Sequence, residues 1–366
     1  MLALKGLLEK LRVVPLVKAL ASFKLNLFVL CSLALLVFFG TIYQSKHGLY
    51  MAQKVFFDSL IVHDGWLILP GVRLVMWLAF LNLSAFMIFK FKYTWKKIGL
   101  IVSHIGLILI LVGGFYNLHF STESILNLRE GEQSSKSEAY YDWQILIADS
   151  EKTVVLPIDI SSNKISAKNI NTLNQVFPEL KIDKFYQNAR IFETPFAGTI
   201  AKEFKVKQEY EQNQPCIVLS DKNNQEYFLD NFDHKSFDYQ NGYKFILKRK
   251  SYELPIIIAL EDVERELHPN TQIAKSYSSK IIVKENFAEQ GRKAKISMNK
   301  PFRYKDYTFF QSGFGIDSDS QEFTSLAVVK NKGRLLPYIA SLLTTLGLVV
   351  HSLISLFNFL RRKVQN

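Results

Sequence analysis

Cysteine is scarce in this chain of 366 residues, which contains only Cys31 and Cys216. Cys31 lies inside an apolar run, where a thiol packs as a small hydrophobic group. Cys216 is alone in the long polar region, so no disulfide bond can form within that region. A folded domain there must rely on its own hydrophobic core, which about 220 residues can supply.

The signatures of several enzyme classes are also absent. The sequence has no phosphate-binding loop, no zinc-type spacing of Cys and His, and no Ser-His-Asp order typical of hydrolases. It has no Cys-x-x-Cys pair, which excludes a dithiol reductant of that kind. It also has no Cys-x-x-Cys-His, which excludes a c-type cytochrome.

Acidic residues are scarce at both ends of the chain. Residues 117–334 contain 30 basic and 30 acidic residues, so the other 15 basic and 3 acidic residues carry the whole net charge of +12. A nucleic-acid-binding protein concentrates its positive charge on a folded domain. Here the positive charge flanks apolar segments, as in membrane proteins, so we do not expect a nucleic-acid partner.

Four apolar segments are long enough to cross a bilayer as helices, which takes about 20 residues each. They cover residues 25–42, 70–89, 98–116 and 335–360. Basic residues precede the first segment, join the second to the third, and follow the fourth. The positive-inside rule therefore predicts that both termini are cytoplasmic, including the tail 361–366. It places the loop 43–69 and the region 117–334 on the outer side.

Residues 1–24 place Leu, Val and Ala between basic residues. This pattern fits a cytoplasmic amphipathic segment lying on the membrane, and it fits a disordered tail equally well. A signal peptide is the competing interpretation of the N-terminus. Because the first apolar segment lacks a clear small-residue cleavage site, we expect an uncleaved anchor.

The region 117–334 has the pattern of a β domain from about Ser137 onward. Short runs of β-branched and aromatic residues alternate with polar turn residues. The predicted strands include Trp143–Ile147, Thr153–Leu156, Phe204–Val206, Cys216–Leu219, Lys244–Leu247, Ile256–Leu260 and Lys280–Val283. The predicted fold class is therefore an integral membrane protein with four transmembrane α-helices plus a large mainly-β extracytoplasmic domain, sandwich or barrel-like.

Two histidines lie inside apolar segments, where an ionisable side chain is costly and indicates a function. His104 lies seven residues after Lys97 and His351 lies ten residues before Arg361. At ~1.5 Å per residue, their depths from the cytoplasmic boundary are about 10 Å and about 15 Å. Such imidazoles can bind a haem iron, meet a ligand from a partner, or hydrogen-bond to a neighbouring helix. Spacing alone favours the last of these.

The other histidines lie outside the apolar segments. His47 and His63 bracket a short amphipathic stretch that we expect at the membrane surface, where a cofactor could dock, so both are further candidate ligands. His119, at the outer end of the third segment, is expected to have no ligand role. His234 and His268 lie in polar turns and are expected to be solvated.

Two stretches of the sequence resemble the ResB-like cytochrome c biogenesis family. The first is the third apolar segment with the acidic turn after it, Ser103-His104-Ile-Gly106-Leu-Ile-Leu-Ile-Leu-Val-Gly113-Gly114 and Leu128-Arg-Glu130-Gly131-Glu132. The second and stronger match is Ser297-Met-Asn299-Lys-Pro301-Phe-Arg-Tyr304-Lys-Asp-Tyr307-Thr-Phe309-Phe310-Gln311-Ser312-Gly313-Phe314. From the residues alone, the second stretch reads as an ordinary hairpin. The small residues Gly113-Gly114 also predict a face that another helix approaches closely.

The resemblance implies a ResB-type subunit of a cytochrome c synthase of System II, in the bacterial inner membrane with its large domain periplasmic. Such a subunit helps to move haem across the membrane and to deliver it to apocytochrome c for covalent attachment. The chain would belong to a haem lyase complex with a CcsA-type membrane protein. It lacks that partner's tryptophan-rich haem-handling segment, so the partner is expected as a separate chain.

The resemblance also implies a site. His104 would be an axial ligand of the iron of a b-type haem that is transported and not covalently bound, and His351 is a second candidate. Two other functions stay open. One is a transmembrane haem-b electron carrier, with His104 and His351 ligating one haem. The other is a non-catalytic membrane-anchored chaperone or scaffold.

Overall fold

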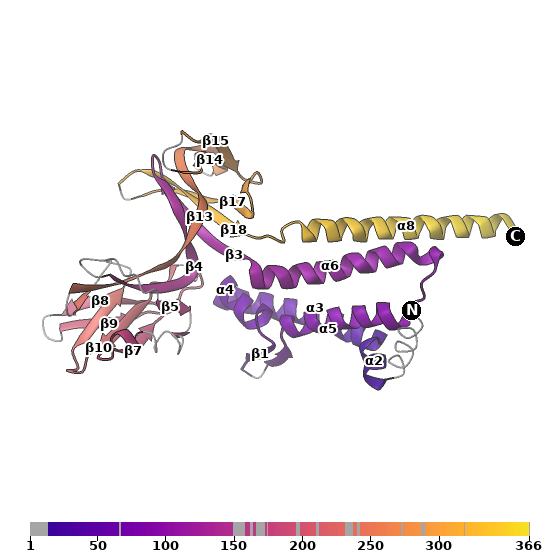
Figure 1. The fold of residues 1–366 in the computed structure, drawn as a ribbon, viewed down its shortest axis with the longest axis horizontal. Helices are drawn as coiled ribbons and strands as arrows, with labels where there is room; N and C mark the ends of the chain where they lie inside the picture. Colours follow the sequence, from indigo (N-terminus) through magenta and orange to yellow (C-terminus); the bar gives the residue numbers. More distant parts are fainter. Residues whose placement is uncertain are drawn as a thin grey trace. The chain divides into compact units, whose positions relative to one another are not determined.

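The computed structural model describes residues 14–65, 67–148, 158–161, 164–165, 173, 175–194, 198–209, 212–230, 237–239, 242–271, 274–286, 290–317 and 319–365. The chain divides into two compact units, Met1–Ser121 with Asn331–Asn366, and Thr122–Lys330. The first unit is mainly helical, and the second consists mainly of strands (Figure 1). The predicted fold class is therefore confirmed, while the sidedness of the domain stays a prediction.

Four helices among the described residues are long and apolar enough to cross a membrane, so the chain is a multi-pass membrane protein. They are α3 (Phe23–His47), α5 (Val72–Ala85) with the π-helical η2 (Phe86–Lys90), η3 (Trp95–Lys97) with α6 (Ile98–Phe120), and α8 (Leu336–Gln365).

The first membrane helix is preceded by the short helix α2 (Pro15–Leu20). The Ser22 side chain caps α3 by accepting a hydrogen bond from the Leu25 N–H at 3.2 Å. The helix ends at Gly48, whose φ of 82° suits a residue without a Cβ. The expected amphipathic segment 1–24 falls partly on residues 1–13, which lie outside the described residues.

The connection from α3 to α5 is amphipathic. It contains α4 (Leu49–Ala52), η1 (Gln53–Phe57) and a hairpin of β1 (Ile61–Asp64) and β2 (Leu67–Pro70). Phe56 is buried in one cluster with Leu36 of α3 and Val75 of α5. Leu49 and Leu60 are exposed. This arrangement ties the connection to the helices while leaving apolar side chains on its surface.

Helices α6 and α8 pack closely and antiparallel through small residues (Figure 1). A Cβ added at Gly99 would lie 2.4 Å from the His351 backbone nitrogen, and one at Gly106 would lie 2.7 Å from that of Thr344. The Ser103 hydroxyl donates to the Thr344 carbonyl at 3.0 Å. At the predicted position the approach is looser: an added Cβ at Gly113 would lie 3.3 Å from Leu336 Cβ of α8, and one at Gly114 would meet nothing closer than Met76 Cε at 4.0 Å. The closest approach of α8 is therefore at Gly99 and Gly106.

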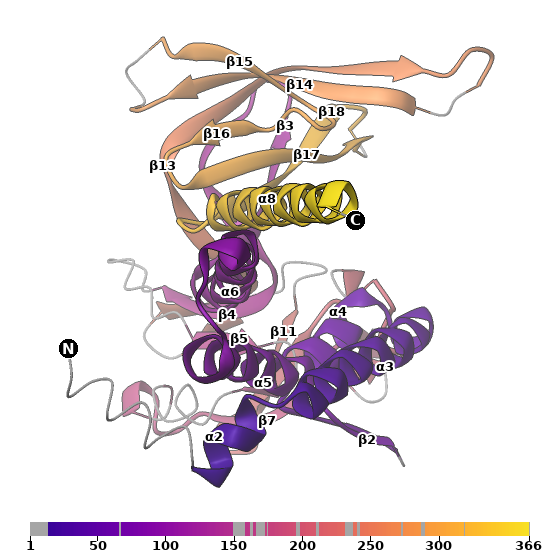
Figure 2. The ribbon, with the colours of Figure 1, turned by 90° about the vertical axis from the view of Figure 1, so that its right-hand side faces the viewer.

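The second unit is called the outer unit here after its predicted side of the membrane, and its largest sheet has eleven strands among the described residues. Its main path runs in the order β15-β14-β13-β4-β3-β18-β17-β16. The strands are β3 (Thr122–Arg129), β4 (Gln133–Ala148), β13 (Tyr243–Leu267), β14 (Ala274–Lys284), β15 (Arg292–Ser297), β16 (Phe302–Tyr304), β17 (Tyr307–Ile316) and β18 (Glu322–Lys330). The end strands β15 and β16 contact each other, so the sheet curls into a nearly closed barrel (Figure 2). Leu126, Ile258, Ile281, Phe309 and Leu326 lie in its core.

A second core lies where β4 and β13 extend beyond the barrel. There Ile145 and Phe245 pack against Ile217 and Leu229 of a three-stranded sheet, β11-β10-β7. This sheet contains β7 (Lys181–Tyr186), β10 (Cys216–Ser220) and β11 (Glu226–Asp230). The smaller strands are β5 (Ile158–Ser161), β6 (Lys164–Ile165), β12 (Phe237–Tyr239) and the hairpin β8 (Ala189–Thr194) and β9 (Gly198–Glu203).

Most predicted strands lie in observed ones, with one error and one merger. Phe204–Val206 is not a strand, because side-chain bonds replace a ladder there: the Asn188 amide donates to the Lys205 carbonyl at 2.8 Å. Lys244–Leu247 and Ile256–Leu260 were expected as two strands and belong to the single strand β13. Thr153–Leu156 lies outside the described residues.

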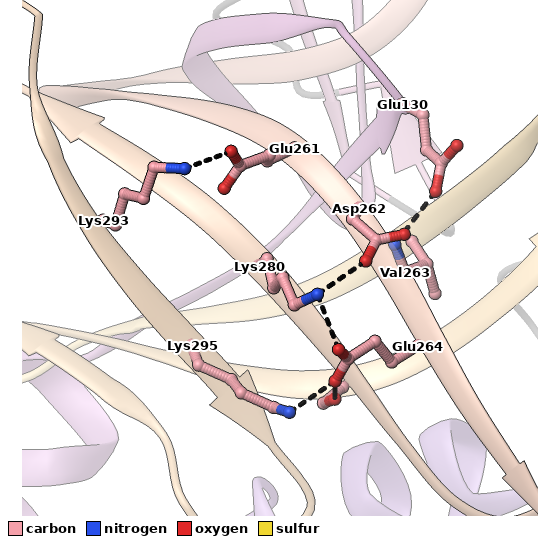
Figure 3. Close-up of polar contacts among 9 residues, drawn as sticks. Glu130, Glu261, Asp262, Val263, Glu264, Lys280, Lys293 and Lys295 are labelled. Atoms are coloured by element: carbon pink, nitrogen blue, oxygen red, sulfur yellow. Dashed lines mark hydrogen bonds and ion pairs between the residues drawn. The ribbon is translucent and has the colours of Figure 1, made fainter.

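The outer face of β13, β14 and β15 carries a ladder of ion pairs (Figure 3). Lys280 on the middle strand contacts Asp262 at 2.9 Å and Glu264 at 2.6 Å. Lys295 and Lys293 of β15 pair with Glu264 and Glu261. Opposite charges that face each other across strands support the register of this sheet.

Candidate functional site

His104 lies on α6 with its side chain partly buried. Its Nδ1 is 2.7 Å from the Leu100 carbonyl oxygen, one helical turn earlier. A carbonyl can only accept a hydrogen bond, so Nδ1 carries the proton and donates. The other ring nitrogen, Nε2, therefore holds a lone pair in the neutral imidazole.

Two phenylalanine rings lie beside the His104 imidazole. The ring centroids of Phe86 and Phe91 are each 5.9 Å from that of His104. Phe86 opens the π-helical stretch η2, and the Phe91 N–H closes it by donating to the Phe86 carbonyl at 2.9 Å. Short π-helical stretches inside α-helices are frequent at functional sites. Here the stretch helps to bring two apolar rings against one polar one.

The residues around His104 fit a haem. Metal-ligating histidines commonly donate their second ring N–H to a backbone carbonyl, which fixes the tautomer and the ring orientation. His104 already has this arrangement. The described residues contain no group of three or more His, Cys, Asp or Glu side chains that could hold a metal ion. A haem iron does not need such a group, because the porphyrin supplies its equatorial nitrogens and the protein supplies an axial ligand.

His351 lies on α8, directly against α6. Its Nδ1 is buried and has no hydrogen-bond partner among the described residues. The prediction that His351 lies deeper than His104 is wrong. The His351 backbone is level with Gly99, and Gly99 lies five residues nearer the basic end of α6 than His104 does. The physical reason is that α8 continues as a helix to Gln365, so Arg361 does not mark the boundary from which the depth was measured.

The structure does not bring His104 and His351 to one face of α6. Ser103, which bonds to α8, and His104 are consecutive, so they point about 100° apart around the helix. Between α6 and α8 the backbones approach too closely at Gly99 for a porphyrin to enter. A haem bound by His104 would therefore have to lie on the side of Phe86 and Phe91.

The remaining histidines are separate from this site. His47 ends α3 and its ring stacks on Tyr43 at 4.2 Å, while His63 is exposed on β1 opposite Ile68. His119 is exposed and its Nδ1 lies 2.9 Å from the Phe115 carbonyl oxygen. His268 is exposed in the outer unit. His234 lies outside the described residues.

The outer unit contains a cavity of about 630 Å³ that sequence reasoning missed. It is lined from β3, β4, β13, β17 and β18, and includes Asn127, Arg129, Tyr140, Arg249, Ser312 and Phe323. The acidic turn and the strand pair, which were singled out separately in the sequence, both contribute to its wall. No feature of the sequence shows that these two stretches meet, because only the folded sheet brings them together.

Polar residues of the acidic turn hold the cavity wall in place. The Glu130 Oε1 accepts from the Val263 N–H of β13 at 2.9 Å (Figure 3). The Glu132 Oε2 accepts from the Arg129 N–H at 3.0 Å. Both carboxylates are used to fix backbone, so the turn is rigid where it meets the cavity.

Gln311 has a similar role on β17. Its Nε2 donates to Thr324 Oγ1 at 2.8 Å and to the Gly313 carbonyl at 2.9 Å, while its Oε1 accepts from Ser279 at 2.7 Å. Ser279 and Thr324 are fully buried. The register with β18 shifts between Gln311 and Gly313. Ser312 is thus the extra residue of a β-bulge, and it lines the cavity.

Both arginines of the cavity wall have partners within the protein. Arg129 Nε lies 2.8 Å from Asp317 Oδ2. Arg249 donates to the Tyr140 carbonyl and lies over the Trp143 ring at 4.8 Å. A cavity that mixes neutralised charges with apolar walls suits a polypeptide better than a strong anion.

Comparisons with known proteins identify the family of the chain. A family model described as the ResB-like family matches residues 82–322, which include His104 and most of the cavity wall and end before Phe323 and His351. Protein NrfI of Wolinella succinogenes is 22% identical over 317 residues, which cover 85% of this chain and 32% of NrfI. The chain thus spans about a third of the length of that curated relative. Since the family model matches well over half of its residues, this multi-pass membrane protein belongs to the ResB-like family.

Proposed function

We propose that the chain is the ResB-type subunit of a cytochrome c synthase, which holds haem at His104 and helps to deliver it across the membrane to apocytochrome c. The observation that carries this proposal is the 2.7 Å bond from His104 Nδ1 to the Leu100 carbonyl. It fixes the ring and leaves Nε2 as an iron ligand inside an apolar helix. The haem is the cargo, and it supplies the vinyl groups that react with the cysteine thiols of apocytochrome c.

Each residue of the site has a separate task in this proposal. His104 binds the iron, and Leu100 keeps the ring in one orientation. Phe86 and Phe91 keep water away from the imidazole, which strengthens its interactions in a medium of low polarity. His351 is the second candidate ligand. Because it and His104 do not lie on one face of α6, it would have to bind haem at a different position from His104.

The cavity of the outer unit is the proposed docking place for the apocytochrome polypeptide. Only Ser124 and Ile125 of β3 are in register with β4. The Glu130 N–H donates to the Glu322 carbonyl of β18. The backbone N–H and C=O groups of even-numbered residues in β3 therefore point toward β18, and those of odd-numbered residues point toward β4. The backbone of Asn127 therefore points to the side where β4 has moved away. An extended segment could pair with it there.

The proposal includes a partner and a location. A CcsA-type membrane protein would act with this chain in the bacterial inner membrane, with both termini of the chain cytoplasmic. Membership of the ResB-like family supports the pairing. The basic residues that flank the apolar segments support the orientation.

The experiment is to replace His104 with Ala and measure both co-purified haem and cytochrome c maturation. We expect the variant to lose haem and maturation, and added imidazole to restore part of both. His119→Ala is the matched control, because His119 makes the same bond to its own helix but is exposed at the end of α6. Normal haem and holocytochrome levels in His104→Ala would refute the assignment. Absence of haem from the wild type, with or without its partner, would favour a chaperone or scaffold.

A further inference from the structure

The segment between α5 and α6 carries a concentration of positive charge close to His104. Lys90 ends η2, and Lys92, Lys96 and Lys97 follow before α6 begins. A cytoplasmic loop of this kind serves membrane orientation in general. One of its lysines is placed differently from the others.

Lys97 is directed toward the His104 site by an aromatic contact. Its Nζ lies 5.7 Å from the centroid of the Phe91 ring, and that ring lies 5.9 Å from the His104 ring. The ammonium group is therefore within about 12 Å of the imidazole. Its backbone is fixed as well, because the Lys97 N–H donates to the Thr94 carbonyl at 2.9 Å and closes the turn η3.

We propose that Lys97 binds a propionate carboxylate of the haem that His104 ligates. The inference rests on the proposed function and adds the group that recognises the cargo's charged edge. Haem is a dicarboxylate, and a carboxylate brought to the edge of a membrane is costly unless a positive group pairs with it. Lys97 supplies that charge, with its apolar stem along Phe91 and its ammonium near the boundary.

The pairing would also orient the haem. Its propionate edge would face the basic segment, and the opposite edge of the macrocycle, where a vinyl group lies, would face away from it. One lysine would then set which edge of the cargo leads toward the outer side. Lys92 offers the matched comparison, because it lies on the same segment, carries the same charge and is exposed.

The test uses the full chain with its CcsA-type partner in nanodiscs, titrated with haem b and with haem dimethyl ester, whose carboxylates are blocked. Absorbance gives the affinities, and transfer of haem to apomyoglobin gives the dissociation rates. We expect Lys97→Gln to weaken binding of haem about 10-fold, the effect of losing one charge-assisted hydrogen bond. The ester should bind equally to both proteins, and Lys97→Arg should retain most of the affinity for haem.

Four results would overturn the inference. Equal loss for haem and for its ester would show that Lys97 acts on something other than the carboxylates. If Lys92→Gln weakened haem binding as much as Lys97→Gln, the effect would come from the positive charge of the whole segment and not from Lys97 itself. If His104→Ala loses haem while Lys97→Gln binds it like the wild type, only this inference fails. If His104→Ala binds haem normally, the proposed function fails first and the inference with it.

Discussion

Replacing Gly106 with Ala should destabilise the contact between α6 and α8 although it adds a single methyl group. The new Cβ would lie 2.3 Å from Thr344 Oγ1, 2.7 Å from Thr344 N and 2.8 Å from the Ala340 carbonyl oxygen, where ordinary contacts begin at 3.4 Å. A rotation of the threonine could relieve the first contact but not the two backbone contacts. Helix α8 must therefore move away by roughly 0.5–1 Å.

The cost follows from that displacement. Overpacking of a close contact typically costs about 1–3 kcal/mol. Moving α8 also stretches the bond from the Ser103 hydroxyl to the Thr344 carbonyl, now 3.0 Å, and such bonds between membrane helices contribute about 0.6 kcal/mol on average. We expect Gly106→Ala to lower the free energy of unfolding by about 2–3 kcal/mol.

The assay is reversible unfolding of the full chain in mixed micelles, followed by ellipticity as the denaturing detergent is increased. Gly114→Ala on the same helix is the control, because its Cβ would meet nothing closer than Met76 Cε at 4.0 Å. Alanine has a higher helix propensity than glycine, so the control should be neutral or slightly stabilising. If Gly106→Ala is as stable as Gly114→Ala, the close packing of α6 on α8 is refuted.

Three further predictions concern the outer unit. Burial, with Asp230 nearby, raises the pKa of the Cys216 thiol to about 12. Cys216 in the folded protein should therefore resist thiol reagents at pH 8 and react after unfolding, and a colorimetric thiol assay measures both. Hydrogen bonds from Lys280 and a second lysine lower the pKa of Glu264 from 4.5 to about 2, so its stabilisation is present above pH 4.5 and is lost as the pH falls toward 2. Unfolding midpoints of Glu264→Gln and the wild type should thus converge in acid, and a constant difference would contradict this. Gln311→Ala should cost about 2 kcal/mol in urea unfolding because it leaves buried polar groups short of partners, whereas Gln321→Ala, at an exposed position, should cost little.

The membrane part of the fold could be predicted from the sequence because apolar length alone determines which segments can span a bilayer. The ends of the helices could not. The first helix continues to His47, past the expected end at residue 42, because polar residues outside the hydrocarbon can remain helical until a glycine with positive φ ends the helix. The relative depths of His104 and His351 were also predicted from an assumed helix end. Helix α8 continues past Arg361 to Gln365, so Arg361 does not mark that end.

The β domain shows a similar limit at Pro255. The sequence predicted two separate strands before and after it, Lys244–Leu247 and Ile256–Leu260, and a proline cannot donate to a ladder. In the structure the register of β13 with β4 shifts between Glu253 and Ile258, so Pro255 lies in the irregular stretch and the strand continues past it. The cavity was hidden for another reason. Its walls join residues near 128 and near 312, which meet only because β3 and β17 both pair with β18.

The long pairing of β13 with β4 has a consequence for how the outer unit unfolds. One end of this ribbon contributes Ile145 and Phe245 to the second core, and the other end of β13 contributes Ile256 and Ile258 to the core of the barrel. Fraying at either end withdraws hydrogen bonds from a ladder on which both cores depend. The outer unit should therefore melt as one cooperative body, with its two cores lost at a single temperature.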